Sequence, residues 1–220
     1  MPNNLEIPKL SDIEVRVLGA LIEKSKTTPD YYPMTLNALT AACNQKSSRH
    51  PVVDYDEETV VMALNQLKAQ SIVAMAIGGS SRINKYKHNF TTVFPLRDGE
   101  LATMCLLFLR GALTPGEVKS NSGRLHEFHS LEAVNELLLK LSTQEPAFVK
   151  ELPKRAGQKE ARYVHLFSDY NETEESVTAI EPARKSVSEL EARVELLEKE
   201  LKEVNEKMAR IYNELYPDGK

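Results

Sequence analysis

Nine basic side chains stand where they could bind phosphate groups. They occur in a polar segment at 46–50, in an expected β-hairpin that includes 82–87, and at three positions in the second half of the chain. Lysine and arginine supply the charge that binds nucleic-acid phosphates, and such binding weakens as salt rises. We therefore expect a surface for double-stranded DNA made of Lys46, Arg49, His50, Arg82, Lys85, Lys87, Lys119, Arg124 and Arg162.

The same residues also allow interpretations without DNA. The segment 46–50 could be a solvated connector between helices, and basic residues on an edge strand could prevent aggregation between sheet edges. The expected third helix begins with Asp56, Glu57 and Glu58, whose carboxylates would repel DNA. The alternative function is therefore a protein-interaction adaptor that docks a protein partner.

Residues suited to catalysis or metal binding are less well arranged. His126 and His129 flank Glu127, but they are three positions apart, whereas the zinc motif His-Glu-x-x-His places its histidines four apart. Cys43 has no evident base beside it, and we expect it to be buried on the apolar side of a helix. The sequence therefore predicts a protein that is not an enzyme and holds no metal or cofactor.

The elements that would position these residues occur twice. The first copy opens with Ser11 and Glu14, which fit a capping box at a helix start. Its expected elements are, in order, a helix from Ser11, a break at 27–30, a second helix from Pro33 or Met34 to Cys43, a third helix from about Asp56, and strands at 71–77 and 83–90 joined by a turn at 78–81.

The second copy follows the same order. Thr114 and Glu117 again fit a capping box, here with Pro115 in the first helical turn. The expected elements are a largely buried helix capped by Asp98, a break at 109–115, a short helix from Thr114, a third helix with apolar residues from Leu131 to Leu141, and strands at 147–152 and 161–167.

Three helices followed by a two-stranded wing define the winged-helix fold, a variant of the helix-turn-helix. We therefore expect a mainly α protein with small β-hairpin wings, in the α+β class, with one winged-helix domain at 1–95 and another at 96–168. The pairs Lys85-Tyr86 and Arg162-Tyr163 occupy equivalent places in the two returning strands.

An acidic linker at 169–183 and a coiled-coil helix at 184–216 are expected to follow. Apolar residues in the helix are spaced three and four apart, as in a heptad seam: Val187, Leu190, Val194, Leu197, Leu201, Val204, Met208, Ile211 and Leu215. The seam predicts a homodimer. The alternative is an amphipathic helix that folds back on its own domains.

The charge of the chain is uneven. The net charge is −4, and residues 169–220 alone carry −6, while 1–95 and 96–168 carry +1 each. DNA binding would therefore depend on local patches of positive charge and not on the net charge of the chain. Because no apolar run of about 18 residues occurs and the first residues lack the pattern of a secretory signal, we expect a cytoplasmic protein with no membrane partner.

The chain resembles the YceH family of uncharacterised bacterial proteins. The resemblance covers 11–168 and rests on Glu23-Lys24, Thr27-Thr28-Pro29, Tyr32-Pro33, Asn37, 42–46, Arg49 and Pro51-Val52, then 109–112, 114–117, Arg124 and Glu127-Phe128, then 160–163 and 165–167. It implies tandem winged-helix domains and often a C-terminal coiled coil, but no activity. Similar proteins are more basic around 119–124, which weakens the case for DNA binding by the second domain.

These observations lead to a dimeric, non-enzymatic DNA-binding protein, with transcriptional regulation as a candidate role. The coiled coil would pair two chains, and the cations of the loop and wing would contact phosphates. The alternative hypothesis is the protein-interaction adaptor, which is favoured by the acidic start of the third helix.

Overall fold

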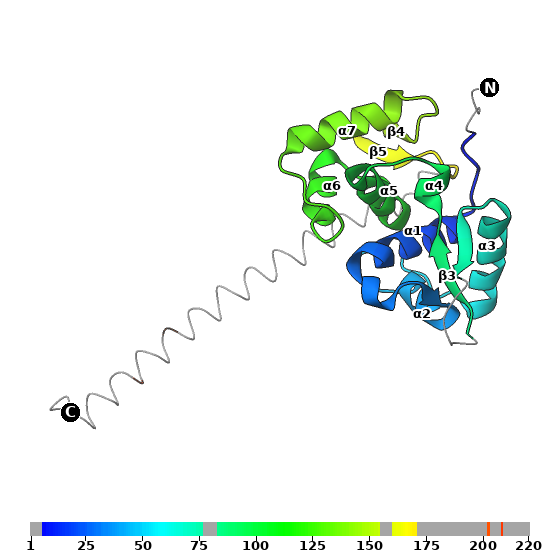
Figure 1. Ribbon diagram of the computed structural model, residues 1–220. Helices are drawn as coiled ribbons and strands as arrows, with labels where there is room; N and C mark the ends of the chain where they lie inside the picture. Colours follow the sequence, from blue (N-terminus) through cyan, green and yellow to red (C-terminus); the bar gives the residue numbers. More distant parts are fainter. Residues whose placement is uncertain (1–5, 77–82, 155–159, 171–201, 203–207, 209–220) are drawn as a thin grey trace. The chain divides into compact units, whose positions relative to one another are not determined.

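The computed structural model describes residues 6–76, 83–154 and 160–170, together with Lys202 and Met208 (Figure 1). Residues 1–170 form one compact unit, and 171–220 form another. Within the first unit, the first half is taken here as residues 6–95 and the second half as 96–170. The described residues have a mixed class, with mainly α-helices and two small antiparallel sheets.

The two halves repeat one order of elements. The first half contains α1 (Asp12–Thr27), a 3-10 turn (Pro29–Tyr31), β1 (Met34–Thr35), α2 (Leu36–Cys43), α3 (Glu57–Ala69), β2 (Val73–Ala76), β3 (Lys85–His88) and α4 (Phe90–Val93). The second half contains α5 (Asp98–Arg110), α6 (Pro115–Ser122), α7 (Leu131–Thr143), β4 (Val149–Leu152) and β5 (Arg162–His165).

Strand pairing repeats as well. In the first half the sheet order is β1-β3-β2, and Met34 pairs with Tyr86. In the second half β4 pairs with β5, and Leu113 forms an isolated bridge with Tyr163. In both halves, therefore, the residue before the N-cap of the second helix pairs with the tyrosine of the returning strand.

Local capping explains where two of the helices begin. The Glu14 backbone N–H donates to Ser11 Oγ at 3.3 Å, and the Ser11 N–H donates to the Glu14 carboxylate at 2.7 Å. Thr114 and Glu117 make the same reciprocal pair at 3.2 and 2.8 Å. Each pair satisfies N–H groups that have no partner within the helix. Both predicted capping boxes are confirmed.

Two local expectations are corrected, and one short helix is new. Met34 and Thr35 do not begin the second helix, because Thr35 is its extended N-cap and accepts from the Ala38 N–H, which leaves Met34 free to join the sheet. Arg97, not Asp98, is the N-cap of α5, and its N–H donates to the Glu100 carboxylate. The short α4 between the halves was not expected.

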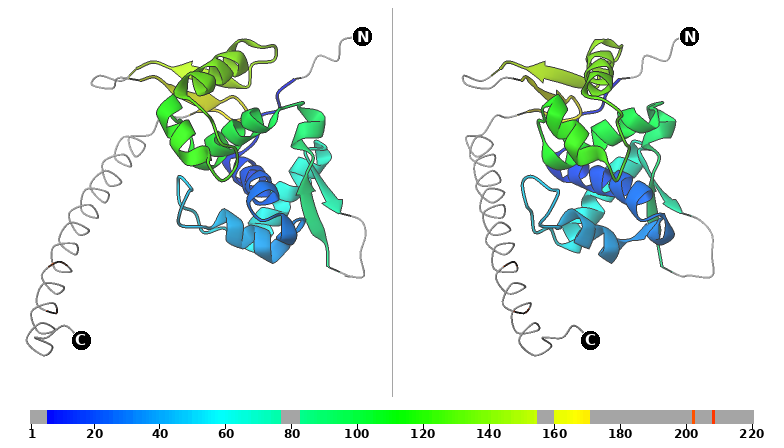
Figure 2. Two further views of the ribbon diagram at one scale, coloured as in Figure 1. Left: turned by 60° about the vertical axis from the view of Figure 1, so that its left-hand side comes forward. Right: turned by 90° about the vertical axis from the view of Figure 1, so that its left-hand side faces the viewer.

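The first helices of the two halves pack against each other. α1 contacts α2, α3 and β3 of its own half and α5 of the other half, so it lies in the middle of the unit (Figure 2). Every residue from Glu14 to Ile22 and from Gly99 to Leu109 is buried. The two halves consequently share one hydrophobic core.

Five phenylalanines extend this core at the connection between the halves. Phe90 and Phe94 come from α4 and its end, and Phe167 follows β5. The ring centroid of Phe167 lies 5.2–5.9 Å from those of Phe90, Phe94, Phe108 and Phe148. The connecting segment is thus packed into the second half.

Replacing Gly19 with valine is expected to destabilise the protein by about 1–3 kcal/mol through overpacking. A Cβ at Gly19 would lie 2.9 Å from Leu109 Cδ2 and 3.1 Å from Phe108 Cβ, which is closer than packed side chains tolerate. Urea unfolding measures the change. The control is Gly123→Ala, which meets no atom within 4 Å; equal stability of the two variants would contradict the close approach of α1 and α5.

Several predicted features lie outside the described residues. These are the turn at 78–81, Arg82, most of the acidic linker and the heptad seam from Val187 to Leu215 apart from Met208. Met208 is helical and 62% exposed. The described part of the chain has no helix long and apolar enough to span a membrane.

Candidate functional site

The predicted phosphate-binding residues separate by burial. Arg49 and Arg162 are buried, with 6% and 5% of their surface exposed. The remaining described members of the set are exposed, namely Lys46, His50, Lys85, Lys87, Lys119 and Arg124. Burial therefore decides which of these residues a DNA phosphate could reach.

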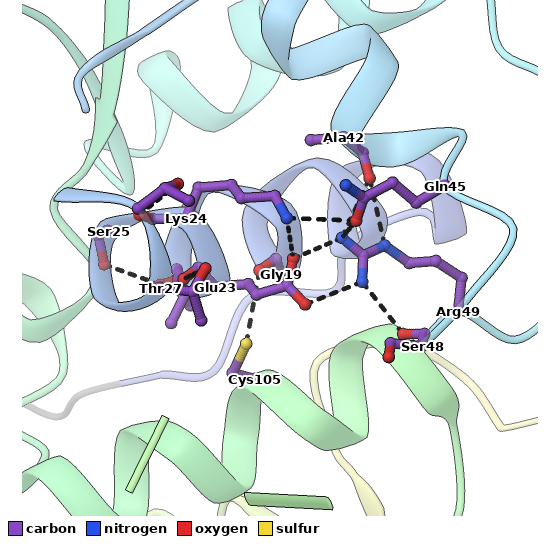
Figure 3. A network of polar contacts seen from close by, with 12 residues as sticks. Gly19, Glu23, Lys24, Ser25, Thr27, Ala42, Gln45, Ser48, Arg49 and Cys105 are labelled. Carbon is purple, nitrogen blue, oxygen red and sulfur yellow. Dashed lines mark hydrogen bonds and ion pairs between the residues drawn. The ribbon is translucent and has the colours of Figure 1, made fainter. Parts of the chain in front are cut away.

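Arg49 forms a buried ion pair with Glu23 of α1 (Figure 3). Its two terminal nitrogens donate to the Glu23 carboxylate at 3.0 and 2.6 Å. The guanidinium also donates to the carbonyls of Ala42 and Ser48 and to the Gln45 side chain. No part of the Arg49 side chain is exposed. Arg49 therefore has a structural role inside the protein, and its expected role as a phosphate contact is corrected.

The carboxylate of Glu23 is held in its charged form. Burial raises its pKa, but hydrogen bonds from Arg49 and then from Lys24 outweigh burial, so the pKa of Glu23 lies below its ordinary value. The Lys24 ammonium is 2.9 Å from Glu23 and also donates to Gln45 at 3.2 Å. The network therefore joins α1 to the segment 44–51 that follows α2.

The segment 44–51 is fixed at both ends. Arg16 of α1, which is 4% exposed, donates to the carbonyls of Cys43 and Pro51 at 3.2 and 2.6 Å. The His50 backbone N–H donates to the Leu109 carbonyl of α5 at 2.8 Å. The segment is therefore held against α1 and α5 by hydrogen bonds, while Lys46, Ser47, Ser48 and His50 remain exposed.

Lys85 and Lys87 lie exposed on β3, while Tyr86 between them is buried. Their pairing partners on β2 are Ala76 for Lys85 and Ala74 for Lys87, whose small side chains leave the ammonium groups uncovered. Because β3 lies between β1 and β2, it is not an edge strand. Protection of a sheet edge therefore does not explain Lys85, which pairs with Thr35 of β1, whereas Lys87 lies beyond the residues that pair with β1.

A polar pocket of about 490 Å³ lies where the halves meet. Its wall is formed by α1 at Glu23, Lys24 and Thr27, by the segment 45–48, by the end of α5 at Leu106, Leu109 and Arg110, and by Asn121, Arg124 and Leu125. The structure thus brings Lys46 and Arg124, predicted from separate halves, to one cavity.

Lys24 and Arg110 were missed by sequence reasoning. Both lie at helix C-termini, where cations are common because they interact favourably with the helix dipole. Because the helix dipole already explains Lys24 and Arg110, the sequence gives no reason to assign them to a binding site. Their shared cavity follows from the packing of α1 on α5, which no local signal in the sequence reports.

The candidate catalytic residues lie in two different parts of the fold, with Cys43 in α2 and the histidines before α7. Burial raises the pKa of Cys43 to about 12, although Arg16 and Arg49 oppose the shift, so its thiol stays protonated at neutral pH. His126, Glu127 and His129 line an open hollow of about 530 Å³. Among the described residues, no group of three or more His, Cys, Asp or Glu could hold a metal ion.

Comparison with known proteins places this chain in a family. Residues 10–158 match DUF480, described as a protein of unknown function, and the chain belongs to this family. It is 40% identical over 211 residues to a UPF0502 protein of Shewanella halifaxensis, which covers 92% of this chain and 98% of the relative. It is 46% identical over 178 residues to one of Opitutus terrae, at 80% and 76% coverage. The expected membership of an uncharacterised bacterial family is confirmed.

Proposed function

We propose that each half is a winged-helix domain and that the chain binds double-stranded DNA as a homodimer. The repeated order of three helices and a hairpin, with one matching strand contact in each half, supports the domain assignment. The observation that carries the DNA proposal is the pair of exposed lysines, Lys85 and Lys87, on the hairpin next to α3.

In this proposal α3 of the first half is the recognition helix. Its N-terminus is acidic, at Asp56, Glu57 and Glu58, but Asn65 and Gln66 lie exposed further along it. Amide side chains can bind the edge of adenine in the major groove. The wing lysines, with Lys46, would contact phosphates, and the heptad seam at 184–216 would pair two chains as a coiled coil.

Changing both wing lysines, Lys85→Gln/Lys87→Gln, is expected to weaken DNA binding and to reduce the slope of log affinity against log salt by about 2 per chain, because two phosphate contacts are lost. Fluorescence anisotropy of labelled duplex DNA with the full chain at several salt concentrations measures both quantities.

The matched control is Lys9→Gln/Lys26→Gln. It also removes two positive charges, but these lysines already pair with Asp169 and Asp98 on the surface. The control should bind DNA as the wild type does. An equal loss in both variants would mean that only net charge matters, and this result would remove the wing from the DNA site.

The adaptor remains a second candidate because of specific exposed residues. Besides the acidic start of α3, Met62 on α3 is 64% exposed and Leu139 on α7 is 59% exposed. Exposed apolar residues on outward helix faces suit protein docking. Absence of DNA binding at low salt, together with a stoichiometric protein captured from extract by the wild type but not by Met62→Gln, would favour the adaptor.

A further inference from the structure

The pocket between the halves has an excess of positive charge. Four cations line it, Lys24, Lys46, Arg110 and Arg124, against one carboxylate, Glu23. That carboxylate is already bound by Arg49 and Lys24. Among the described residues, the side chains of Lys46, Arg110 and Arg124 form no hydrogen bond or ion pair. Three cations therefore share one cavity, and none of them is directly paired with a carboxylate of the described residues.

Arg110 is the least exposed of the three cations. It is half-buried at the C-terminal end of α5, and burial followed by the charge of nearby Arg49 lowers its pKa. Glu23 and Glu117 oppose this shift from a distance. A guanidinium near a second, fully buried guanidinium is stabilised by any anion that enters the pocket.

The rest of the lining indicates the kind of anion. Leu106, Leu109 and Leu125 supply an apolar part of the wall, and Ser47 and Ser48 supply hydroxyl groups. A volume of about 490 Å³ is within the range of small-molecule pockets. It cannot admit a DNA duplex. Arginine matches phosphate oxygens particularly well, because its planar fork can donate two parallel hydrogen bonds.

The wall is also held in place before any ligand binds. The segment 45–48 is tied to α1 through Arg49 and Glu23, and to α5 through the His50 N–H and the Leu109 carbonyl. Ser48 keeps a left-handed backbone with φ of 59°, and its carbonyl accepts from Arg49. A preformed wall lowers the entropy lost on binding.

We propose that this pocket binds a small molecule whose phosphate groups carry two or more negative charges. Arg110 and Arg124 of the second half and Lys46 of the first half would contact these groups. Because the lining comes from α1, the segment 45–48, α5 and the end of α6, the bound molecule would join the two halves and oppose their separation. This site does not include the wing lysines, Lys85 and Lys87, and it shares only Lys46 and Arg124 with the cations expected to bind DNA.

Isothermal titration of the full chain with inorganic pyrophosphate and with ADP tests the proposal, with adenosine as the uncharged comparison. Pyrophosphate and ADP should bind saturably, and adenosine at least about tenfold more weakly, which corresponds to about 1.4 kcal/mol. Arg110→Gln should weaken the binding of both anions by tenfold or more. Lys150→Gln removes an exposed cation that lies outside the pocket and has no side-chain partner among the described residues, so it should leave their binding unchanged.

Two results would overturn the proposal. One is the absence of saturable binding of both pyrophosphate and ADP by the wild type, and the other is unchanged binding by Arg110→Gln. Since Arg110 has no side-chain partner among the described residues, its loss should not unfold the protein, and a thermal melt checks this. Arg110→Gln should also retain DNA binding while Lys85→Gln/Lys87→Gln retains pyrophosphate binding, so the two proposals can fail independently.

Discussion

Replacing Glu23 with leucine is expected to lower the free energy of unfolding by about 3–5 kcal/mol. The change leaves the Arg49 guanidinium, which has no exposed surface, without its carboxylate. The remaining acceptors, the Ala42 and Ser48 carbonyls and Gln45, are neutral. A buried charge that has lost its counter-charge costs far more than a surface pair that is broken. Urea unfolding followed by circular dichroism measures the loss.

A double-mutant cycle separates the ion pair from its surroundings. Glu23→Leu/Arg49→Met removes both charges, and much of the lost stability should return because the unpaired buried charge is gone. Lys9→Met breaks the exposed pair with Asp169 and should change stability by no more than about 1 kcal/mol. If Glu23→Leu is no more destabilising than Lys9→Met, Arg49 is not buried against Glu23 and returns to the set of accessible cations.

Lowering the pH from 7 to 5 is expected to destabilise the protein by about 2 kcal/mol for each of two histidines. Burial is the main reason that the pKa of His165 and of His88 falls from 6.5 to about 4, with smaller contributions from Lys9 and Lys26 respectively. The unfolded chain takes up protons below about pH 6.5, but the folded chain keeps both rings neutral. Stability is therefore lost as the pH falls through 6.5 towards 4, and it is unaffected by these groups above 6.5.

Thermal melts at half-unit pH steps measure the effect, and His165→Leu isolates one contribution. The His165 ring packs edge-on against Phe108 with centroids 4.9 Å apart, and its buried Nδ1 has no hydrogen-bond partner among the residues that the structure describes. Leucine should therefore be tolerated and should flatten the pH dependence. The exposed His129→Gln is the control and should keep the wild-type slope. A slope unchanged by His165→Leu would contradict the neutral buried ring.

The pH window also distinguishes histidines from carboxylates. The pKa of Glu23 lies below its ordinary value of 4.5, so its contribution is complete above that pH and is lost only as the pH falls further. A loss of stability between pH 7 and 5 therefore reports on His88 and His165. The loss below pH 4.5 includes the Glu23–Arg49 pair.

Much of the element order was predictable because its signals are local. Ser11 with Glu14, and Thr114 with Glu117, are partners only three residues apart, so the sequence itself brings them together. The end of α1 before Pro29 likewise follows from the proline alone. The short strand at Met34 was missed because its pairing partner, Tyr86, is distant in the chain.

The candidate site was only partly predictable, because it too depends on contacts between residues that are distant in the chain. The basic segment at 46–50 marked a polar region correctly, but it made Lys46 and Arg49 look equivalent. Whether an arginine is buried or exposed depends on the groups around it in space, because a charge leaves water only where a counter-charge compensates it. For Arg49 that group is Glu23, which is 26 residues away.

The sequence by itself therefore determined the helices other than α4, the paired strands, their repetition and the positions of the cations, since periodicity, caps and turns act over a few residues. Only the tertiary structure decided that α1 packs on α5, that Arg49 is buried, and that Lys24, Lys46, Arg110 and Arg124 line one pocket. These outcomes depend on groups far apart in the chain, whose interaction energies exist only after packing has excluded water between them.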